Sequence, residues 1–230
     1  MKIDSLTLAA VAAELRRRAT GPLGWVVVPR REQVVIALPR GGFCVSIAAA
    51  DPRAHLVDQV PPSPRPEPSI QTHLDSLLRG GELLEAATVR FDRVLCLEIA
   101  NLDRIGEPRR YRVMIELMGK HSAFTVVDEQ GLILATLKPV SRAVNRHREL
   151  LPRVPYVPPP GDLEDPLALT AESFAAAWPA LTAAPSLKAG WRATWYGLSD
   201  ELWDYLCRVA GLSPEPEPAE ATRERLWAAW

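Results

Sequence analysis

The sequence has few cysteines and no long apolar run, and both absences limit what the chain can be. Its three cysteines, Cys44, Cys96 and Cys207, are far apart and odd in number. This argues against a disulfide framework, and buried free thiols are expected for Cys44 and Cys96. No stretch approaches the ~20 apolar residues of a membrane span, and the N-terminal residues lack the layout of a signal peptide. These features predict a cytoplasmic protein.

Catalytic and cofactor-binding motifs are missing as well. The sequence contains no Gly-x-Ser-x-Gly nucleophile elbow and no dinucleotide-binding fingerprint. The stretch 119–122 resembles the end of a phosphate-binding loop, but Met114 stands where that loop needs its first glycine. The four histidines have no metal-ligand spacing with one another or with cysteine. We therefore expect no enzyme activity, no cofactor and no metal.

The chain also lacks an overall positive charge, since its net charge is −1, which argues against a dedicated nucleic-acid binder. The charges are nevertheless unevenly distributed. Residues 1–153 carry 22 Lys and Arg against 17 Asp and Glu, whereas residues 154–230 carry 5 against 11. A polyanionic partner is therefore expected to contact the first part of the chain.

Hydrophobic periodicity predicts both helices and strands in the chain. Helical spacing of apolar residues predicts a first helix with Asp4 at its N-cap position, ending before Gly21-Pro22. A second helix is expected over 70–79, and residues 142–151 are interpreted as a basic, partly helical segment. Apolar runs bounded by turn residues predict strands at 25–28, 34–38, 43–47, 94–99, 111–117, 123–127 and 132–137.

Prolines between 152 and 160 mark a change in composition, and therefore a domain boundary. Beyond them, Ala, Leu, Trp and acidic residues predict helices at about 170–182, 186–196 and 199–210. The predicted domains are a β-rich domain over 1–157 and a helical hairpin domain over 162–230.

Polar residues at unusual places in apolar strands are the candidate functional residues. Asp92 and Arg93 place an acid beside a base at the beginning of a strand, where they either serve a function or cap a turn as a strand-edge charge pair. Glu116 lies within an apolar run, and its alternative interpretation is a solvent-facing member of an alternating strand. Asp4 has a structural alternative as a helix cap, worth about 1 kcal/mol.

Taken in order, these residues resemble the N-terminal domain of the NFACT family, the ribosome-associated quality-control tailing factors of bacteria and eukaryotes. Many bacterial members are labelled fibronectin-binding protein A. The motifs that carry the resemblance are Phe91-Asp92-Arg93-Val94, Ile115 to Ser122, Val126-Val127-Asp128, Leu151-Pro152 and Tyr156 to Pro160. The similarity covers roughly residues 1–212, and residues 188–212 resemble the family's helix-hairpin module.

The resemblance implies both a fold and a role. The fold is an α+β domain similar to the N-terminal domain of formamidopyrimidine-DNA glycosylases. The role is to bind tRNA, alanyl-tRNA in bacteria, and the large ribosomal subunit with a stalled peptidyl-tRNA, so that an untemplated C-terminal tail is added. The residues implied in tRNA binding are Asp92, Arg93, Glu116, Leu117, Met118 and Asp4, with Lys120 and His121 as further candidate RNA contacts.

The sequence also departs from the family pattern. Leu74-Asp75-Ser76 stands where members carry a basic Leu-Arg-Lys, which puts a ribosomal RNA contact by that helix in doubt. Ala123 replaces the asparagine that commonly follows His-Ser. Full-length members continue into a coiled coil, whereas this chain stops at Trp230, so it is either a fragment or a short relative.

Two other functions remain as alternatives. One is a fibronectin-binding surface adhesin, which the absence of a signal peptide, an anchor and a repeat array argues against. The other is a catalytically dead nucleic-acid binder of the glycosylase fold. Those enzymes use an N-terminal proline amine as nucleophile, and this chain begins with Met1-Lys2.

Overall fold

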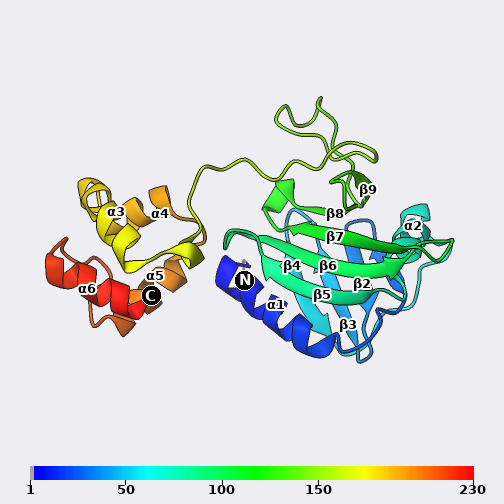
Figure 1. Cartoon of the computed structure of the whole chain (residues 1–230), viewed down its shortest axis with the longest axis horizontal. Helices are drawn as coiled ribbons and strands as arrows, with labels where there is room; N and C mark the ends of the chain where they lie inside the picture. The colour runs from blue at the N-terminus through cyan, green and yellow to red at the C-terminus, as the bar shows by residue number, and fades with distance from the viewer. Residues whose placement is uncertain (1–2) are drawn as a thin grey trace. The chain divides into compact units, whose positions relative to one another are not determined.

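The computed structural model describes residues 3–230, and the chain divides into two compact units (Figure 1). The first unit comprises residues 7–89 and 93–160 together with residue 3, and the second comprises residues 4–6, 90–92 and 161–230. Met1 and Lys2, on which the exclusion of an N-terminal nucleophile depends, lie outside the described residues. Residues 3–230 form two antiparallel sheets and six α-helices, which confirms the α+β class.

The first sheet is a four-stranded meander in the order β1-β2-β3-β4. Its strands are β1 (Val26–Arg30), β2 (Gln33–Ala37), β3 (Gly42–Ser46) and β4 (Arg53–Val57). Gly41, at a φ of 75°, closes the β2–β3 hairpin, where Ala37 pairs with Gly42. The first three strands confirm the sequence prediction, and β4 was missed.

The second sheet is a five-stranded meander in the order β5-β6-β7-β8-β9. Its strands are β5 (Glu82–Thr88), β6 (Val94–Leu102), β7 (Pro108–Glu116), β8 (Ala123–Val127) and β9 (Ile133–Thr136). Four of the five were predicted, and β5 was missed because Glu82–Thr88 carries little alternation of apolar and polar residues.

One hydrophobic core joins the two sheets with α1 (Ser5–Arg18) and α2 (Ser69–Leu78). Along β6, every second residue (Leu95, Leu97 and Ile99) enters this core, as the two-residue period of a strand requires. Residues of β7 and β8 do the same. Each large side chain fully removed from water contributes about 1.5–3 kcal/mol. The opposite side chains of β6 and β7 are therefore left to form the other face of this sheet, where Glu116 lies.

Helix α2 covers the open edge of the first sheet. β1 is an edge strand, so its outward backbone amides need partners from elsewhere. The amide of Val28 donates to Gln71 Oε1 at 2.8 Å, and that of Val26 donates to Asp75 Oδ1 at 2.8 Å. Asp75, which stands where the resembled family has a basic residue, therefore accepts a backbone hydrogen bond at the edge of the first sheet.

Residues 142–151 do not form the partly helical segment that the sequence predicts. They form turns followed by an extended stretch. The segment is closed instead by an antiparallel bridge between Val140 and Leu150, whose backbone groups exchange hydrogen bonds of 3.1 and 2.8 Å. This pairing occupies both backbone groups of Leu150, near the end of the predicted segment.

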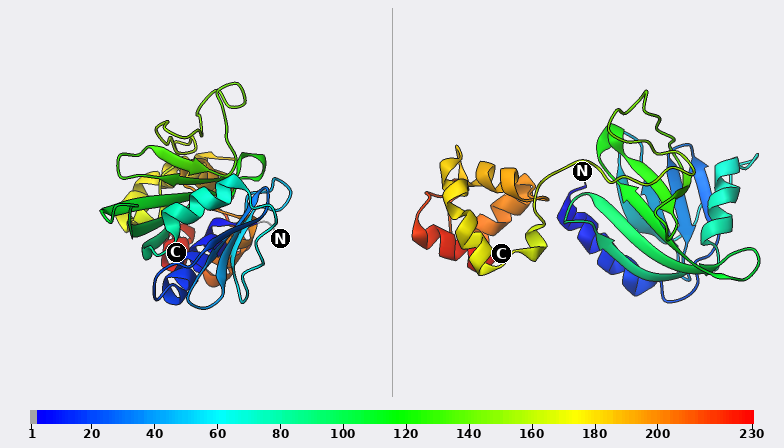
Figure 2. Two further views of the ribbon diagram at one scale, coloured as in Figure 1. Left: turned by 90° about the vertical axis from the view of Figure 1, so that its right-hand side faces the viewer. Right: turned by 45° about the horizontal axis from the view of Figure 1, so that its top comes forward.

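The second unit is helical, and its elements are α3 (Ala171–Ala183), α4 (Leu187–Thr194), α5 (Asp200–Val209) and α6 (Glu220–Ala229). Figure 2 shows these helices grouped around one another with no strand among them. Phe174 and the tryptophans Trp178, Trp191, Trp195 and Trp203 form most of their core. Side chains of Thr170, Ser186 and Ser199 cap the first three helices, as their positions before each apolar run require.

Candidate nucleic-acid interface

The turn between β5 and β6 carries Asp92 and Arg93. The amide of Val89 donates to the carbonyl of Val94 at 2.8 Å, which closes a tight hairpin. Arg90 and Phe91 occupy the left-handed region, with φ of 52° and 51°, a conformation that costs a residue with a side chain about 1–2 kcal/mol. Strain of this kind gathers at functional sites. The turn leaves Asp92 half-buried and Arg93 exposed.

Strand register brings this turn next to the second group of predicted residues. Val94 pairs with Glu116 across β6 and β7, and the amide of Leu117 donates to the carbonyl of Arg93 at 2.9 Å. Residues more than 20 positions apart in sequence therefore meet at one end of the second sheet. The two motifs that were predicted separately thus lie at the adjoining ends of the paired strands β6 and β7.

Glu116 is fully buried, with 0% of its surface exposed, so its interpretation as a solvent-facing strand residue is wrong. Arg148 binds the carboxylate in a two-pronged ion pair, with Nη1 at 2.7 Å from Oε1 and Nη2 on Oε2. The Tyr156 hydroxyl donates to Oε1 at 2.8 Å. Arg148 is only 6% exposed and also donates to the carbonyl of Val157 at 3.0 Å. Each charged group in this network has its partner.

The network shifts the protonation of its members. Burial, followed by the charge of the Glu116 carboxylate, raises the pKa of the Tyr156 phenol far above its usual range. Burial works against the positive charge of Arg148, but the hydrogen bond and charge of Glu116 outweigh it and raise the pKa of that guanidinium. Tyr156 is thus held as a neutral donor and Arg148 as a cation.

The residues that follow Glu116 divide into buried and accessible ones. Leu117 is buried in the core of the first unit. Met118 is half-buried, and its amide donates to Ser122 Oγ at 2.9 Å. A single 3₁₀ turn, Gly119–His121, then leaves Lys120 and His121 exposed. Of this motif, Met118, Lys120 and His121 are therefore able to touch a ligand directly.

Asp4 is half-buried and precedes α1, at the position that the sequence predicts for a helix cap. Its Oδ2 accepts a hydrogen bond from the hydroxyl of Ser199 at 3.1 Å, a residue of the same compact unit. Ser199 is itself the cap of α5. No pattern in the sequence indicated this contact, because the two residues are 195 positions apart.

The sequence prediction missed Arg148 and Tyr156 as members of the site. Tyr156 belongs to the Tyr-x-Pro-Pro-Pro motif, but that motif was given no role of its own. Arg148 was one of several arginines in a basic run, with nothing to distinguish it from its neighbours. Only the burial of its side chain separates it from them.

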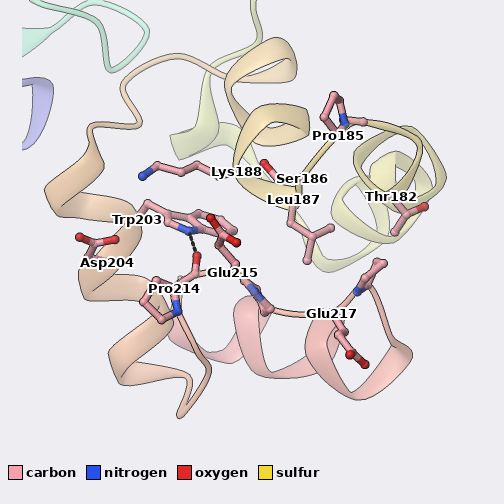
Figure 3. A pocket seen from close by; sticks show the side chains of 13 residues that line it. Thr182, Pro185, Ser186, Leu187, Lys188, Trp203, Asp204, Pro214, Glu215 and Glu217 are labelled. Carbon is pink, nitrogen blue, oxygen red and sulfur yellow. Dashed lines mark hydrogen bonds between the residues drawn. The ribbon is translucent and has the colours of Figure 1, made fainter.

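A pocket in the second unit has the wrong charge for RNA. The cavity, of about 350 Å³, lies beside Trp203, whose Nε1 donates to the carbonyl of Pro214 at 2.8 Å (Figure 3). Asp204, Glu215 and Glu217 line it against a single Lys188. Phosphate groups would be repelled from such a wall.

Residues 3–230 contain neither a metal cluster nor a membrane-spanning helix. Among them, no group of three or more His, Cys, Asp and Glu side chains is placed to hold a metal ion. None of the helices in that range is both long enough and apolar enough to cross a membrane.

Comparison with known proteins shows similarity to one family and to proteins named Rqc2 homolog RqcH. Residues 4–230 match the family model described as NFACT N-terminal and middle domains. A protein named Rqc2 homolog RqcH from Streptococcus suis (strain 05ZYH33) is 26% identical over 166 residues, which span 70% of this chain and 30% of that protein. Its namesake from Bacillus subtilis (strain 168) is 28% identical over 174 residues, spanning 73% of this chain and 30% of the relative. The chain thus matches under a third of the length of these relatives.

Two solved structures with the same fold are those of streptococcal proteins. The N-terminal part of the fibronectin/fibrinogen-binding protein from Streptococcus suis superposes with a TM-score of 0.83 at 21% identity, over 99% of this chain and 84% of that one. The N-terminal domain of the fibronectin-binding protein PavA from Streptococcus pneumoniae gives a TM-score of 0.78 at 24% identity, over 90% and 78%. At these identities the likeness establishes the fold.

Proposed function

The chain belongs to the NFACT family, and we propose that it acts in ribosome-associated quality control as a module that binds tRNA and the large ribosomal subunit. By family resemblance, the tRNA is alanyl-tRNA and the subunit is one that carries a stalled peptidyl-tRNA. The module supports untemplated alanine tailing of the stalled chain. The coiled coil and further domains of longer members would supply the remaining contacts.

The observation that carries this proposal is the register between β6 and β7. It places the exposed Arg93 beside the strand end that leads to Met118, Lys120 and His121. These side chains lie in the short turns that flank the adjoining ends of two paired strands, so the pairing of those strands holds them near one another. A rigid arrangement of this kind suits recognition of single-stranded bases.

The chemistry of the Asp92–Arg93 turn fits an unstacked base. A guanidinium can stack on a base or donate two hydrogen bonds to its edge, and a carboxylate accepts hydrogen bonds from base amino groups. A surface that bound only phosphates would gain nothing from Asp92, because a carboxylate repels them. We therefore assign this pair to the bases of an anticodon loop.

The remaining predicted residues fall into two roles within the proposal. Met118, Lys120 and His121 are accessible and would contact the RNA directly. Glu116 and Leu117 are buried, so they would support the site from within. Asp4 is half-buried and accepts the Ser199 hydroxyl, so it would act by holding that residue, the cap of α5, in place.

We propose that the chain catalyses no reaction. We also propose that it acts in the cytoplasm. Without a catalytic motif in the sequence, the kinship in fold with the glycosylases, which the family resemblance implies, would extend to nucleic-acid binding alone.

A second candidate function comes from the names of the structural neighbours, which are fibronectin- and fibrinogen-binding proteins. The likeness to them lies below 25% identity and concerns the fold. If fibronectin binding is the function of this chain, it should bind fibronectin in a direct assay, and tRNA should neither bind it nor compete.

The test is tRNA binding by single variants of the turn at two salt concentrations, with a melting curve for each. Arg93→Ala should weaken binding by on the order of 1–3 kcal/mol, the worth of one good two-pronged base contact. Asp92→Ala should weaken binding as well, although it removes a negative charge. The effect of Asp92 is the informative one, because a purely electrostatic surface would bind RNA more tightly without it.

The chain offers a matched control at the other end of the same sheet. Asp103 and Arg104 are also an adjacent acid and base in a hairpin turn, between β6 and β7. Asp103 accepts the amides of Ile105 and Glu107 at 3.0 Å each, so it caps its turn. Arg104→Ala should leave tRNA binding unchanged. Tighter binding by Asp92→Ala, or lower stability of both turn variants with unaltered affinity, would refute the base-reading proposal.

A further inference from the structure

A short basic loop, residues 141–147, has no role in the function proposed above. Arg142, Arg146 and His147 are exposed, and the Arg142 side chain is 82% accessible. Val144 at its tip is 80% exposed. The loop is nevertheless ordered, because the amides of Val144 and Asn145 both donate to the carbonyl of Ser141 at 2.9 Å. It therefore presents its cations in a defined turn.

Both ends of this loop are fixed to the strand end that carries the candidate interface. At its start, Lys138 Nζ donates to the carbonyl of Lys120 at 3.4 Å and pairs with Glu32 at 3.2 Å. At its end, Arg148 forms the buried ion pair with Glu116. Residues 138–148 are thus tied to residues 116–120 at both ends of the loop. The residues that flank the loop, Lys138 and Arg148, therefore hold it near residues 116–120.

The buried pair explains how the loop keeps this place. Removing two charges from water costs several kcal/mol per ion, and the cost is recovered only when geometry and hydrogen bonds are complete. Glu116 is satisfied by Arg148 and Tyr156, and Arg148 by Glu116 and the Val157 carbonyl. A displaced loop would leave these groups buried without partners. The network therefore specifies one position for the segment.

We propose that loop 141–147 binds the phosphate backbone of the same tRNA whose bases the Asp92–Arg93 turn reads. Arg142 and Arg146 bind the phosphates, while Glu116, Arg148 and Tyr156 are positioning residues that hold the loop in place. This inference rests on the proposed function and adds a second RNA-binding element to it. It also gives Glu116 an indirect part in RNA binding, in keeping with its burial.

Charge favours a polyanion over a protein surface as the partner. The loop exposes two guanidinium groups and an imidazole, and the acid nearest to them, Glu149, lies 3.8 Å from Arg142 Nε. That distance leaves the guanidinium's other donors for a ligand. Arginine donates to phosphate oxygens with two parallel hydrogen bonds, which makes it well suited to this task.

The experiment compares tRNA binding by the full chain and by the double variant Arg142→Ala/Arg146→Ala across a range of salt. We expect weaker binding by on the order of tenfold or more. The slope of log affinity against log salt should become shallower by about 1 for each phosphate that the variant no longer neutralises. The reduction should be the same for tRNAs with different anticodon loops, since phosphates carry no sequence. Arg93→Ala should instead act on one sequence more than another.

The control is Arg31→Ala/Arg40→Ala, which removes the same charge from exposed turns of the first sheet. This control should change the slope of log affinity against log salt by much less than the loop variant does. If Arg93→Ala weakens binding and the loop variant does not, the loop proposal is wrong while the proposed function stands. If the wild-type chain binds no tRNA, both are wrong. Weaker binding of the loop variant to large ribosomal subunits, with unchanged affinity for free tRNA, would place the loop on the subunit and would also overturn the proposal.

A double-mutant comparison separates positioning from mere stability. Tyr156→Phe removes one hydrogen bond to Glu116 and keeps the ring, so the chain should stay folded. It should weaken tRNA binding in the wild-type background. In the Arg142→Ala/Arg146→Ala background it should have no further effect on affinity, because the guanidinium groups that it positions are gone. Equal effects in both backgrounds would show that Tyr156 does not act through the loop.

Discussion

At the scale of single residues, the buried carboxylate of Glu116 is the most informative feature of the chain. A glutamate in an apolar strand is ordinarily the residue that faces water. Here its strand face is covered by the segment that carries Arg148 and Tyr156. The carboxylate exchanges its hydration shell for a guanidinium and a phenol, and both partners come from a stretch with no regular secondary structure. Burial of one residue therefore orders a loop.

Glu116→Gln should destabilise the chain by about 3–5 kcal/mol, because it leaves the buried Arg148 without a counter-charge. Urea unfolding measured by fluorescence would give the value. Glu98→Gln is the matched control, since Glu98 is half-exposed on the neighbouring strand β6. Its loss should be at most about 1 kcal/mol, as for other accessible charges. Equal losses for the two variants would mean that the ion pair contributes nothing beyond an ordinary surface charge.

At the scale of elements, strands β4 and β5 show where periodicity fails. β5 pairs with β6 along its length but is largely accessible on both faces, and its sequence favours a helix as much as a strand. β5 is a strand because its backbone groups form hydrogen bonds with the edge of β6. β4 likewise depends on its backbone pairing with β3. The elements that the sequence predicts correctly are those that bury an apolar face.

The hairpin turns give a test at the same scale. Gly41→Ala places a Cβ 2.1 Å from the carbonyl oxygen of Val57, in addition to the cost of a left-handed alanine. Gly106 has a similar φ of 84°, but nothing lies within 4 Å of its added Cβ. Gly106→Ala should therefore cost about 1–2 kcal/mol, and Gly41→Ala clearly more, in thermal unfolding. The same loss at both positions would show that the β2–β3 turn relaxes without cost.

At the scale of the whole molecule, each compact unit has a hydrophobic core of its own. The first is built mainly from aliphatic residues of the two sheets, and the second from aromatic residues of the helices. Trp191 is the centre of the second, in contact with Phe174, Trp195 and Trp203. The excess of acid over base in residues 154–230 lies almost wholly in this unit. The first unit, which contains Arg93 and residues 116–121, holds the basic excess.

Separate cores predict separate responses to a cavity. Trp191→Ala should cost about 3–5 kcal/mol in the unit that contains α3–α6. Its indole nitrogen has no hydrogen-bond partner among residues 3–230, so the loss is one of packing alone. Hydrogen exchange should accelerate in the helices and stay unchanged in β6–β8. Leu97→Ala, in the first core, is the reciprocal control. It should accelerate hydrogen exchange in the sheets and leave exchange in α3–α6 unchanged. Faster exchange in both units from either variant would contradict two independent cores.

The sequence by itself determined most strands, the approximate ends of α1 to α5 and the family, whereas α6 (Glu220–Ala229) was missed. These depend on short-range patterns: the two-residue period of β6, the turn glycine at Gly41 and the caps at Ser186 and Ser199 are each readable within a few residues. The Asp92–Arg93 turn and the run from Glu116 to His121 were also identified as candidates, because they interrupt apolar patterns.

Only the tertiary structure decided what surrounds those candidates. Glu116 is joined to Arg148 and Tyr156, which are 32 and 40 positions away. No local pattern distinguishes the one buried arginine of residues 142–148 from the exposed ones beside it. Residues 142–151 likewise depend on contacts that no local pattern shows, namely the Val140–Leu150 bridge and the Arg148–Glu116 ion pair. A buried ion pair outweighs weak local helix propensity, because a charge without a partner costs several kcal/mol whereas propensity contributes tenths per residue.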